Sequence, residues 1–329
     1  MSSNFKALRT IETSNGTFES EICERNIDDL PNGDVLIRVE YSSLNYKDAL
    51  SANGNKGVTK NYPHTPGIDA AGIVEESSDK NFPVGTSVVV TGFDLGMNTS
   101  GGFSEYIRVP SQWVVNCPDN LSTKKAMVLG TAGLTAGLCS LSILNKVLPE
   151  KSNIIVSGAT GGVGSIGVHL LSSLNANVTA ITSKTDEIEY LKKLGATSII
   201  KKNEFQNSTK APLSRGMYDA AIDVVGGNIL SSIISSMRYN GIITICGNVS
   251  NHKFQTSVFP FILRANSLIG IDSANCSIEK RKVIWNKFAS EWNLNKLDLI
   301  SKTVSLNDLP HEIQKIINGK QIGRVLVKL

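Results

Sequence analysis

The most informative stretch of this sequence is IIVSGATGGVGSIGVHLL, Ile154–Leu171. A β-branched run ends at Ser157, glycines follow at positions 158, 161, 162, 164 and 167, and an amphipathic pattern starts at once. Gly162, Gly164 and Gly167 match the spacing G-x-G-x-x-G, in which glycine allows a sharp turn out of a strand and close approach of the backbone to a pyrophosphate. The N-terminus of the following helix offers unpaired N–H groups to the phosphates. We therefore predict a dinucleotide-binding turn, with a tight turn that holds no ligand as the alternative.

β-branched runs alternate with helical patterns around this turn. The candidate strands are NIIVS (from Asn153), VTAIT (from Val178), TSII (from Thr197), DAAIDVV (from Asp219), IITIC (from Ile242) and SLIGID (from Ser267). Between them, apolar residues recur at helical spacing in two stripes, Ile166, Leu170, Leu174 and Leu230, Ile233, Ile234, Met237. Six buried strands separated by amphipathic helices predict an α/β fold with a doubly wound, parallel Rossmann sheet.

The first part of the chain has a different pattern. Short alternating runs such as Val35–Leu44 are separated by Pro and Gly turn signals, for example at Pro66-Gly67, and this predicts a compact β-rich domain. The pattern changes near Lys124. After Asp272 only a helix at roughly Glu279–Trp292 and a strand at Arg324–Leu329 are expected, too little for a third domain. We expect domains at 1–124 and 125–272, with 273–329 returning to the first.

Composition excludes several classes of protein. The 329 residues carry 33 basic and 29 acidic side chains, a balance too even to predict binding to nucleic acid. No apolar run is expected to approach the roughly 18 residues that cross a bilayer, and MSSNFKALRT does not resemble a signal peptide. The cysteines are odd in number, scattered and never in a CxxC pair, which favours the reducing cytoplasm.

The end of the second predicted strand indicates which dinucleotide binds. A site for NAD places an acid there to hold the ribose 2′-hydroxyl. Here Ser183 and Lys184 follow the strand, and the first acid, Asp186, comes later. A hydroxyl and an ammonium group suit a 2′-phosphate, so NADPH is preferred; the alternative is that Lys184 is a solvated lysine at a helix start. Lys202, after the third strand, is a weaker candidate for the same phosphate.

Over its whole length, the chain resembles a medium-chain dehydrogenase/reductase. The resemblance lies in PHTPGIDAAGIVEES (from Pro63), FPVGTSVVV (from Phe82), GGFSEY (from Gly101) and the ATGGVG turn. Four further strings resemble the acryloyl-CoA reductase branch, which includes quinone oxidoreductase-like proteins: SSLNYKDAL (Ser42–Leu50), KAMVLGTAGLTAGLC (Lys125–Cys139), VFPFILR (Val258–Arg264) and IGRVLVKL (Ile322–Leu329). The resemblance implies a GroES-like catalytic domain before the Rossmann domain, and a homodimer paired through the strand at Ser267–Asp272.

The chain departs from the zinc enzymes of this superfamily. They place Cys, His and Cys around a catalytic metal, and the matching positions here hold Asn45, Ile68 and Thr131. The resemblance therefore implies a member with no metal site. Without a Lewis acid to polarise an alcohol oxygen, reduction of an activated C=C bond becomes the natural chemistry.

The resemblance also implies which residues form the site. Tyr46 lies beside the nicotinamide, and the remaining cofactor contacts are Thr160, Gly161, Gly162, Val163, Thr182, Ser183, Lys184, Lys202, Asn248, Ile262 and Ser273. Tyr46, Asn45 and Asp48 are candidates to donate a hydrogen bond or a proton to the substrate. In the alternative, Asn45 and Asp48 cap a helix and Tyr46 only packs against the cofactor. Asp69 is either a second polar group of the site or a buried structural acid.

These inferences predict an NADPH-dependent enzyme that reduces the C=C bond of acryloyl-CoA to give propanoyl-CoA. One alternative is an NADPH:quinone oxidoreductase, and another is an NADPH-binding protein without activity. The expected partners are a small acyl-CoA substrate and a second copy of the chain, with no nucleic acid and no membrane.

Overall fold

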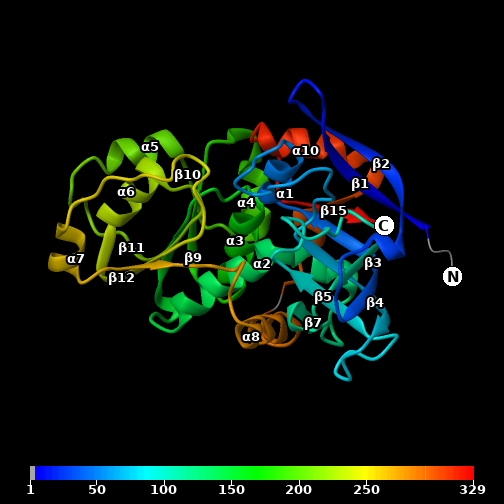
Figure 1. The fold of residues 1–329 in the computed structure, drawn as a ribbon. Coiled ribbons are helices and arrows are strands. Elements are labelled where there is room, and N and C mark those ends of the chain that lie inside the picture. Colours follow the sequence, from blue (N-terminus) through cyan, green and yellow to red (C-terminus); the bar gives the residue numbers. More distant parts are fainter. Residues whose placement is uncertain (1–3, 293) are drawn as a thin grey trace. The chain divides into compact units, whose positions relative to one another are not determined.

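The computed structural model describes residues 4–292 and 294–329 (Figure 1). These residues form two compact units. The first runs to Thr131 and adds Ala274–Ser290 and Ile300–Leu329, and the second holds Ala132–Ser273 and Glu291–Leu299.

The second unit contains a parallel sheet in the order β10-β9-β8-β11-β12-β13. Its strands are β8 (Asn153–Val156), β9 (Asn177–Thr182), β10 (Ser198–Lys201), β11 (Tyr218–Asp223), β12 (Met237–Ile245) and β13 (Ser267–Gly270). From β8 the chain winds to β9 and β10 on one side, then returns to β11 on the other side. The order of winding thus reverses between β8 and β11, which confirms the doubly wound Rossmann sheet.

Helices connect these strands because apolar stripes on them cover the β-branched faces of the sheet. They are α3 (Gly162–Ser173), α4 (Ile188–Leu194), α5 (Lys202–Ser208), α6 (Gly227–Ser235) and α7 (Phe259–Arg264), and α2 (Thr123–Leu144) precedes β8. Leu230 and Ile233 of α6 pack with Ile155 of β8 and Ile243 of β12 in one buried cluster. This packing fixes where the strands end, and hence where the loops that follow them lie.

The first unit is mainly antiparallel. Its larger sheet has the order β14-β15-β3-β4-β5-β7, with β6 also paired to β3, and β1 and β2 form a separate hairpin. The strands are β1 (Asn4–Glu12), β2 (Phe18–Asn26), β3 (Val35–Leu44), β4 (Asp69–Ser77), β5 (Ser87–Thr91), β6 (Tyr106–Val109), β7 (Val114–Asn116), β14 (Ser301–Ser305) and β15 (Arg324–Lys328). The other helices are α1 (Tyr46–Ala52), α8 (Ile278–Ala289), α9 (Leu297–Ile300) and α10 (Leu309–Ile317). Because β15 pairs antiparallel with β3, the last residues of the chain lie beside Tyr41–Leu44.

Three expectations about local structure were wrong. Met237 is not on the helical stripe: α6 ends at Ser235, and Met237 begins β12 while still packing in the same cluster. The helix expected up to Trp292 ends at Ala289. Finally, α2 is long and apolar enough to cross a membrane by length and composition, although 78% of its apolar window is buried in the protein. That burial is what the core helix of a globular fold shows, so α2 gives no evidence for a membrane.

Candidate functional site

The glycine turn after β8 leaves no room for side chains. Gly158 has a φ of +57°, and a Cβ there would lie 2.4 Å from Val224 Cγ2. A Cβ on Gly164, in the first turn of α3, would lie 2.3 Å from the carbonyl oxygen of Gly158. The backbone is therefore folded onto itself, and Gly161 takes the N-cap position of α3. A turn of this kind in front of a 12-residue helix fits a pyrophosphate, whose charge the helix N-terminus stabilises.

A buried hydrogen bond between Ser157 and Asp223 fixes the start of this turn. It lies between β8 and β11, where the order of the strands reverses. Ser157, the residue after β8, donates through Oγ to Asp223 Oδ1 at 2.5 Å, and Asp223 ends the neighbouring β11. The carboxylate also accepts from Gly226 N at 2.8 Å. Burial raises the pKa of Asp223, while the hydrogen bond from Ser157 opposes that rise. These donors belong to the residues around the turn, so Asp223 stabilises the loops there. The sequence analysis did not identify Asp223.

Most of the predicted cofactor residues follow the carboxyl ends of strands in the second unit. Thr160, Gly161, Gly162 and Val163 follow β8, Thr182 ends β9 with Ser183 and Lys184 after it, Lys202 follows β10, Asn248 follows β12 and Ser273 follows β13. Thr182 Oγ1 accepts a hydrogen bond from Lys184 N at 2.9 Å, which fixes the backbone of this short turn. Burial lowers the pKa of the half-buried Lys184, and Glu187 opposes this. In parallel sheets ligands bind at this edge, so the arrangement suits one extended dinucleotide.

Ile262 is placed differently. It lies on α7, whose last residue, Arg264, donates to the carbonyl oxygens of Ser235 and Met237 at the start of β12. This is the amino-terminal end of the sheet. Within one chain, the structure does not bring Ile262 together with the other predicted cofactor residues.

In the first unit, the predicted catalytic residues lie where β3 ends and α1 begins. Tyr46 is the first residue of α1 and is 46% exposed. Asn45 and Asp48 are buried, and Asp48 Oδ2 accepts from Asn45 N at 2.7 Å, so Asp48 caps the helix from its third position. Its other oxygen accepts from Ile68 N at 2.8 Å. The geometry gives Asp48 a structural role and leaves the Tyr46 phenol accessible.

A polar network next to this helix start is centred on Asp69, which is fully buried. Its carboxylate accepts from Ser43 Oγ (2.7 Å), Asn45 Nδ2 (2.7 Å) and both the backbone N and Oγ1 of Thr131. The guanidinium of Arg324 lies 3.6 Å away and also donates to Ser43 Oγ and Asn45 Oδ1. The sequence analysis missed Arg324; the only signal was an arginine directly before the apolar run Val325–Val327 of the terminal strand.

The same network raises the pKa of Asp48. Burial is the main cause, the nearby Asp69 carboxylate adds to it, and the pKa reaches about 7. Burial lowers the pKa of Arg324, but the two carboxylates oppose this. One buried cation thus faces two buried acids, and burial together with the neighbouring carboxylate makes Asp48 hold its proton more tightly than usual.

Gly130 lets α2 join this network. Its φ of 50° and ψ of −151° break the helix, and Thr131 begins a new helical segment whose first N–H meets Asp69. A Cβ at Gly130 would lie 2.4 Å from Asp69 Oδ2 and 2.6 Å from Ser43 Oγ. The polar side chains of the network occupy the space that a side chain at position 130 would need.

The residues at the matching zinc positions do not fit that metal. Asn45, Ile68 and Thr131 supply an amide, a hydrocarbon and a hydroxyl, whereas zinc prefers thiolate, imidazole and carboxylate ligands. The amide and the hydroxyl already bind Asp69, and a buried guanidinium lies beside them. In the described parts of the chain, no group of three or more His, Cys, Asp or Glu side chains is placed to hold a metal ion.

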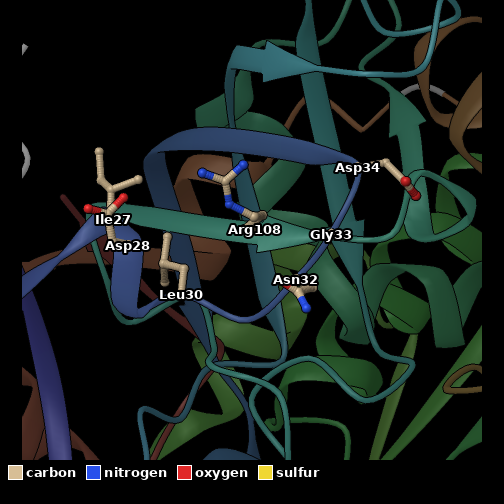
Figure 2. Close-up of a pocket in the computed structure, with 7 residues that line it drawn as sticks. All are labelled: Ile27, Asp28, Leu30, Asn32, Gly33, Asp34 and Arg108. Atoms are coloured by element: carbon tan, nitrogen blue, oxygen red, sulfur yellow. The ribbon is translucent and has the colours of Figure 1, made fainter.

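The first unit also has a surface hollow of about 590 Å³, shown in Figure 2. Its lining residues are Ile27, Asp28, Leu30, Asn32, Gly33, Asp34 and Arg108. Arg108 pairs with Glu76 and Asp34 accepts from Ser111 N, so two of the three charged residues in the lining already have partners. None of the predicted site residues lines this hollow.

Comparisons with known proteins agree with this geometry. The family model of the alcohol dehydrogenase GroES-like domain matches residues 31–119, and that of the zinc-binding dehydrogenase matches residues 162–289. The chain is 39% identical over 331 residues to YhfP of Bacillus subtilis, named as a quinone oxidoreductase, and covers 100% of both chains. It is 36% identical over 317 residues to the acrylyl-CoA reductase AcuI of Ruegeria pomeroyi, covering 96% of each.

Two solved structures resemble the whole chain. The yhdH oxidoreductase of Salmonella enterica, in complex with NADP, has a TM-score of 0.95 at 36% identity and covers 98% of this chain and 99% of its own. Bacillus subtilis yhfP, with NAD bound, has a TM-score of 0.96 at 38% identity, with 100% of both chains covered. Together with the glycine turn, these similarities show that the chain belongs to the medium-chain dehydrogenase/reductase family, in the group of acryloyl-CoA reductase and quinone oxidoreductase-like proteins.

Proposed function

We propose that this oxidoreductase uses NADPH to reduce the C=C bond of acryloyl-CoA, giving propanoyl-CoA. The observation that carries the proposal is the Asp69–Arg324 network at the zinc positions. It offers no ligand set for a Lewis acid, and it includes Asn45, the residue directly before the exposed Tyr46. Reduction of an activated C=C bond needs a hydride and hydrogen-bond donors rather than a metal-bound alkoxide.

The cofactor is NADPH. The glycine turn and the N-terminus of α3 receive the pyrophosphate, while Ser183 and Lys184 receive the 2′-phosphate. Lys202, at the start of α5, adds positive charge after the next strand. The solved relative from Salmonella enterica binds NADP, which supports this assignment, whereas the one from Bacillus subtilis was solved with NAD.

When bound, NADPH supplies the hydride that reaches the β-carbon of the enoyl thioester. The protein must then stabilise the enolate oxygen and allow a proton to reach the α-carbon. We assign the donor role to Tyr46, because its phenol is accessible at the first position of α1. Asn45 and Asp48 position it by fixing the first turn of that helix. In the alternative, Tyr46 only packs against the nicotinamide and water supplies the proton.

A quinone oxidoreductase is the second candidate, favoured by the name of the Bacillus subtilis relative. Oxidation of NADPH should therefore be measured with acryloyl-CoA, crotonyl-CoA and a benzoquinone, with NADH as the cofactor control. Turnover with acryloyl-CoA and inhibition by free CoA support the proposal. Turnover with the quinone alone would replace it with the second candidate.

We further propose that the enzyme is a cytoplasmic homodimer. All five cysteines are free thiols in the structure, consistent with a reducing compartment. The strand β13 lies at the edge of the sheet, and such edges are usually covered or paired. Light scattering in solution tests the dimer directly.

A further inference from the structure

An asparagine stands directly before a glycine at five places in the sequence. The five asparagines are Asn15, Asn32, Asn53, Asn240 and Asn318. In such a pair the backbone nitrogen of the glycine can attack the side chain of the asparagine, because glycine has no Cβ to hinder the approach. The attack converts asparagine to aspartate or isoaspartate. In the folded protein, the outcome at each pair depends on whether the glycine nitrogen is free to react.

Four of the five glycine nitrogens donate a hydrogen bond. The bonds are 3.0 or 3.1 Å long and join Gly16 N to Thr13 O, Gly54 N to Ser51 O, Gly319 N to Ile316 O and Gly241 N to Asn266 Oδ1. A backbone amide that is bonded in this way must open locally before its nitrogen can react. The fold therefore protects these four pairs.

Gly33 differs from the other four glycines. Its nitrogen donates no hydrogen bond to any residue in the described ranges of the chain. Asn32 is exposed, and both residues line the surface hollow of the first unit, where Figure 2 shows them on one loop. This loop comes just before β3 and has no helical or strand structure at these two residues. Water therefore reaches a pair that no hydrogen bond of the glycine nitrogen holds.

The fold requires glycine at position 33. A Cβ there would lie 2.7 Å from the carbonyl carbon of Val109 and 2.8 Å from its nitrogen. Val109 is the last residue of β6 and pairs with Val35 at the start of β3. A side chain at position 33 would thus push against the backbone of a paired strand. The reactive pair belongs to the way in which β3 meets β6.

We propose that Asn32 is a site of spontaneous deamidation and that it reacts before the other four asparagines in the folded protein. Gly33 N loses its proton to a base in the solvent and forms a bond to Cγ of Asn32. The bond from Cγ to Nδ2 then breaks, and the nitrogen takes a proton from the solvent and leaves as ammonia. Water opens the resulting five-membered ring at one of its two carbonyl groups, which gives aspartate or isoaspartate. No electrons are transferred, and water is the only reactant besides the protein.

The reaction changes the charge of the hollow. Asp28 and Asp34 already line it, and Arg108 in the same lining pairs with Glu76. Deamidation adds a further carboxylate beside them. Isoaspartate also adds a methylene group to the backbone just before β3. The modification therefore alters the surface charge and the start of this strand.

Peptide mapping can follow each of the five pairs separately. Cleavage after lysine and arginine places the five asparagines on five different peptides, and the peptide with Asn32 spans residues 26–38. The purified protein is kept for days at mildly alkaline pH in water labelled with heavy oxygen, and mass spectrometry measures the label in each peptide. The same measurement in urea gives the rate of each pair in the unfolded chain.

The ratio of the unfolded to the folded rate tests the role of the hydrogen bonds. We expect folding to slow the other four pairs about fivefold or more relative to Asn32, which is the factor that a hydrogen bond of about 1 kcal/mol represents. The proposal is wrong if another asparagine reacts first in the folded protein, or if folding protects Asn32 as strongly as the other four.

Matched variants give a second readout. Glutamine has one more methylene group than asparagine, which makes ring closure harder. Asn32→Gln should therefore remove most of the acidic forms that isoelectric focusing detects in the aged protein. Asn15→Gln, in the turn between β1 and β2, is the matched control and should leave these forms in place. If instead Asn15→Gln removes them and Asn32→Gln does not, the reaction occurs in that turn and the proposal is overturned.

Discussion

The cofactor turn of the second unit is built from backbone, whereas the polar network of the first unit is built from side chains. Gly158 and Gly164 act by having no Cβ, and they lie within seven residues of each other. Asp69 and Arg324 act through their charges and lie far apart in the sequence. The first kind of site depends on space and the second on charge balance, so different substitutions should damage them.

The largest effect is expected from Arg324→Met. It would leave Asp69 buried without its cation, and breaking such a pair costs about 3–5 kcal/mol of unfolding free energy. Urea denaturation followed by circular dichroism measures this cost. The matched control is Arg238→Met, which removes a partly exposed pair with Asp219 and should cost about 1 kcal/mol or less. Equal losses in the two variants would contradict a charge-based network.

Gly164→Ala tests the backbone side of the comparison. Its Cβ would collide with the carbonyl of Gly158, and we expect the Kd for NADPH to rise about 100-fold, or roughly 2.7 kcal/mol. Gly161→Ala, in the same turn, would place its Cβ 3.3 Å from the carbonyl oxygen of Gly158 and should change the Kd for NADPH little. Fluorescence titration compares the two. If they behave alike, lack of space is not what the turn requires.

The pH dependence of stability tests the charge balance. The folded protein holds the Asp48 proton up to about pH 7, while the unfolded chain releases it near the ordinary value of 3.8. Between these values the folded state binds more protons, so the unfolding free energy should fall as pH rises, by up to about 1.4 kcal/mol per pH unit. Asp48→Asn should remove this part of the slope. The stabilisation is complete below pH 3.8 and lost as pH rises through 7; a slope that survives the substitution belongs to another group.

The smallest effect is expected at the 2′-phosphate. Lys184→Ala should raise the KM for NADPH about fivefold and leave that for NADH unchanged, because a partly exposed charge contact is worth about 1 kcal/mol. Steady-state rates with both cofactors measure it. A parallel loss with NADH would mean that Lys184 supports the turn rather than the phosphate.

The same contrast explains what the sequence could predict. The Rossmann strands follow from local runs of β-branched residues, and the glycine turn follows from spacing within 18 residues, so both could be read directly. Arg324 could not, because its partners Ser43 and Asp69 are adjacent only after β15 pairs with β3. Met237 was misassigned because its apolar side chain packs in the same cluster as the helix before it. Ile262 lies in the segment between β12 and β13. Its position depends on the path of that segment, which the spacing of apolar residues does not encode.

The position of Arg324 has a consequence for the order in which the chain can fold during synthesis. The arginine is translated 281 residues after Ser43, to which it donates. At about 5–20 residues per second, the ribosome needs roughly 14 to 56 s to cover that distance. Until then the newly made Asp69 lacks the guanidinium of Arg324, while all the strands of the Rossmann sheet have been made by Gly270. The second unit can therefore reach its native packing on the ribosome before the first, whose core closes only with the last residues of the chain.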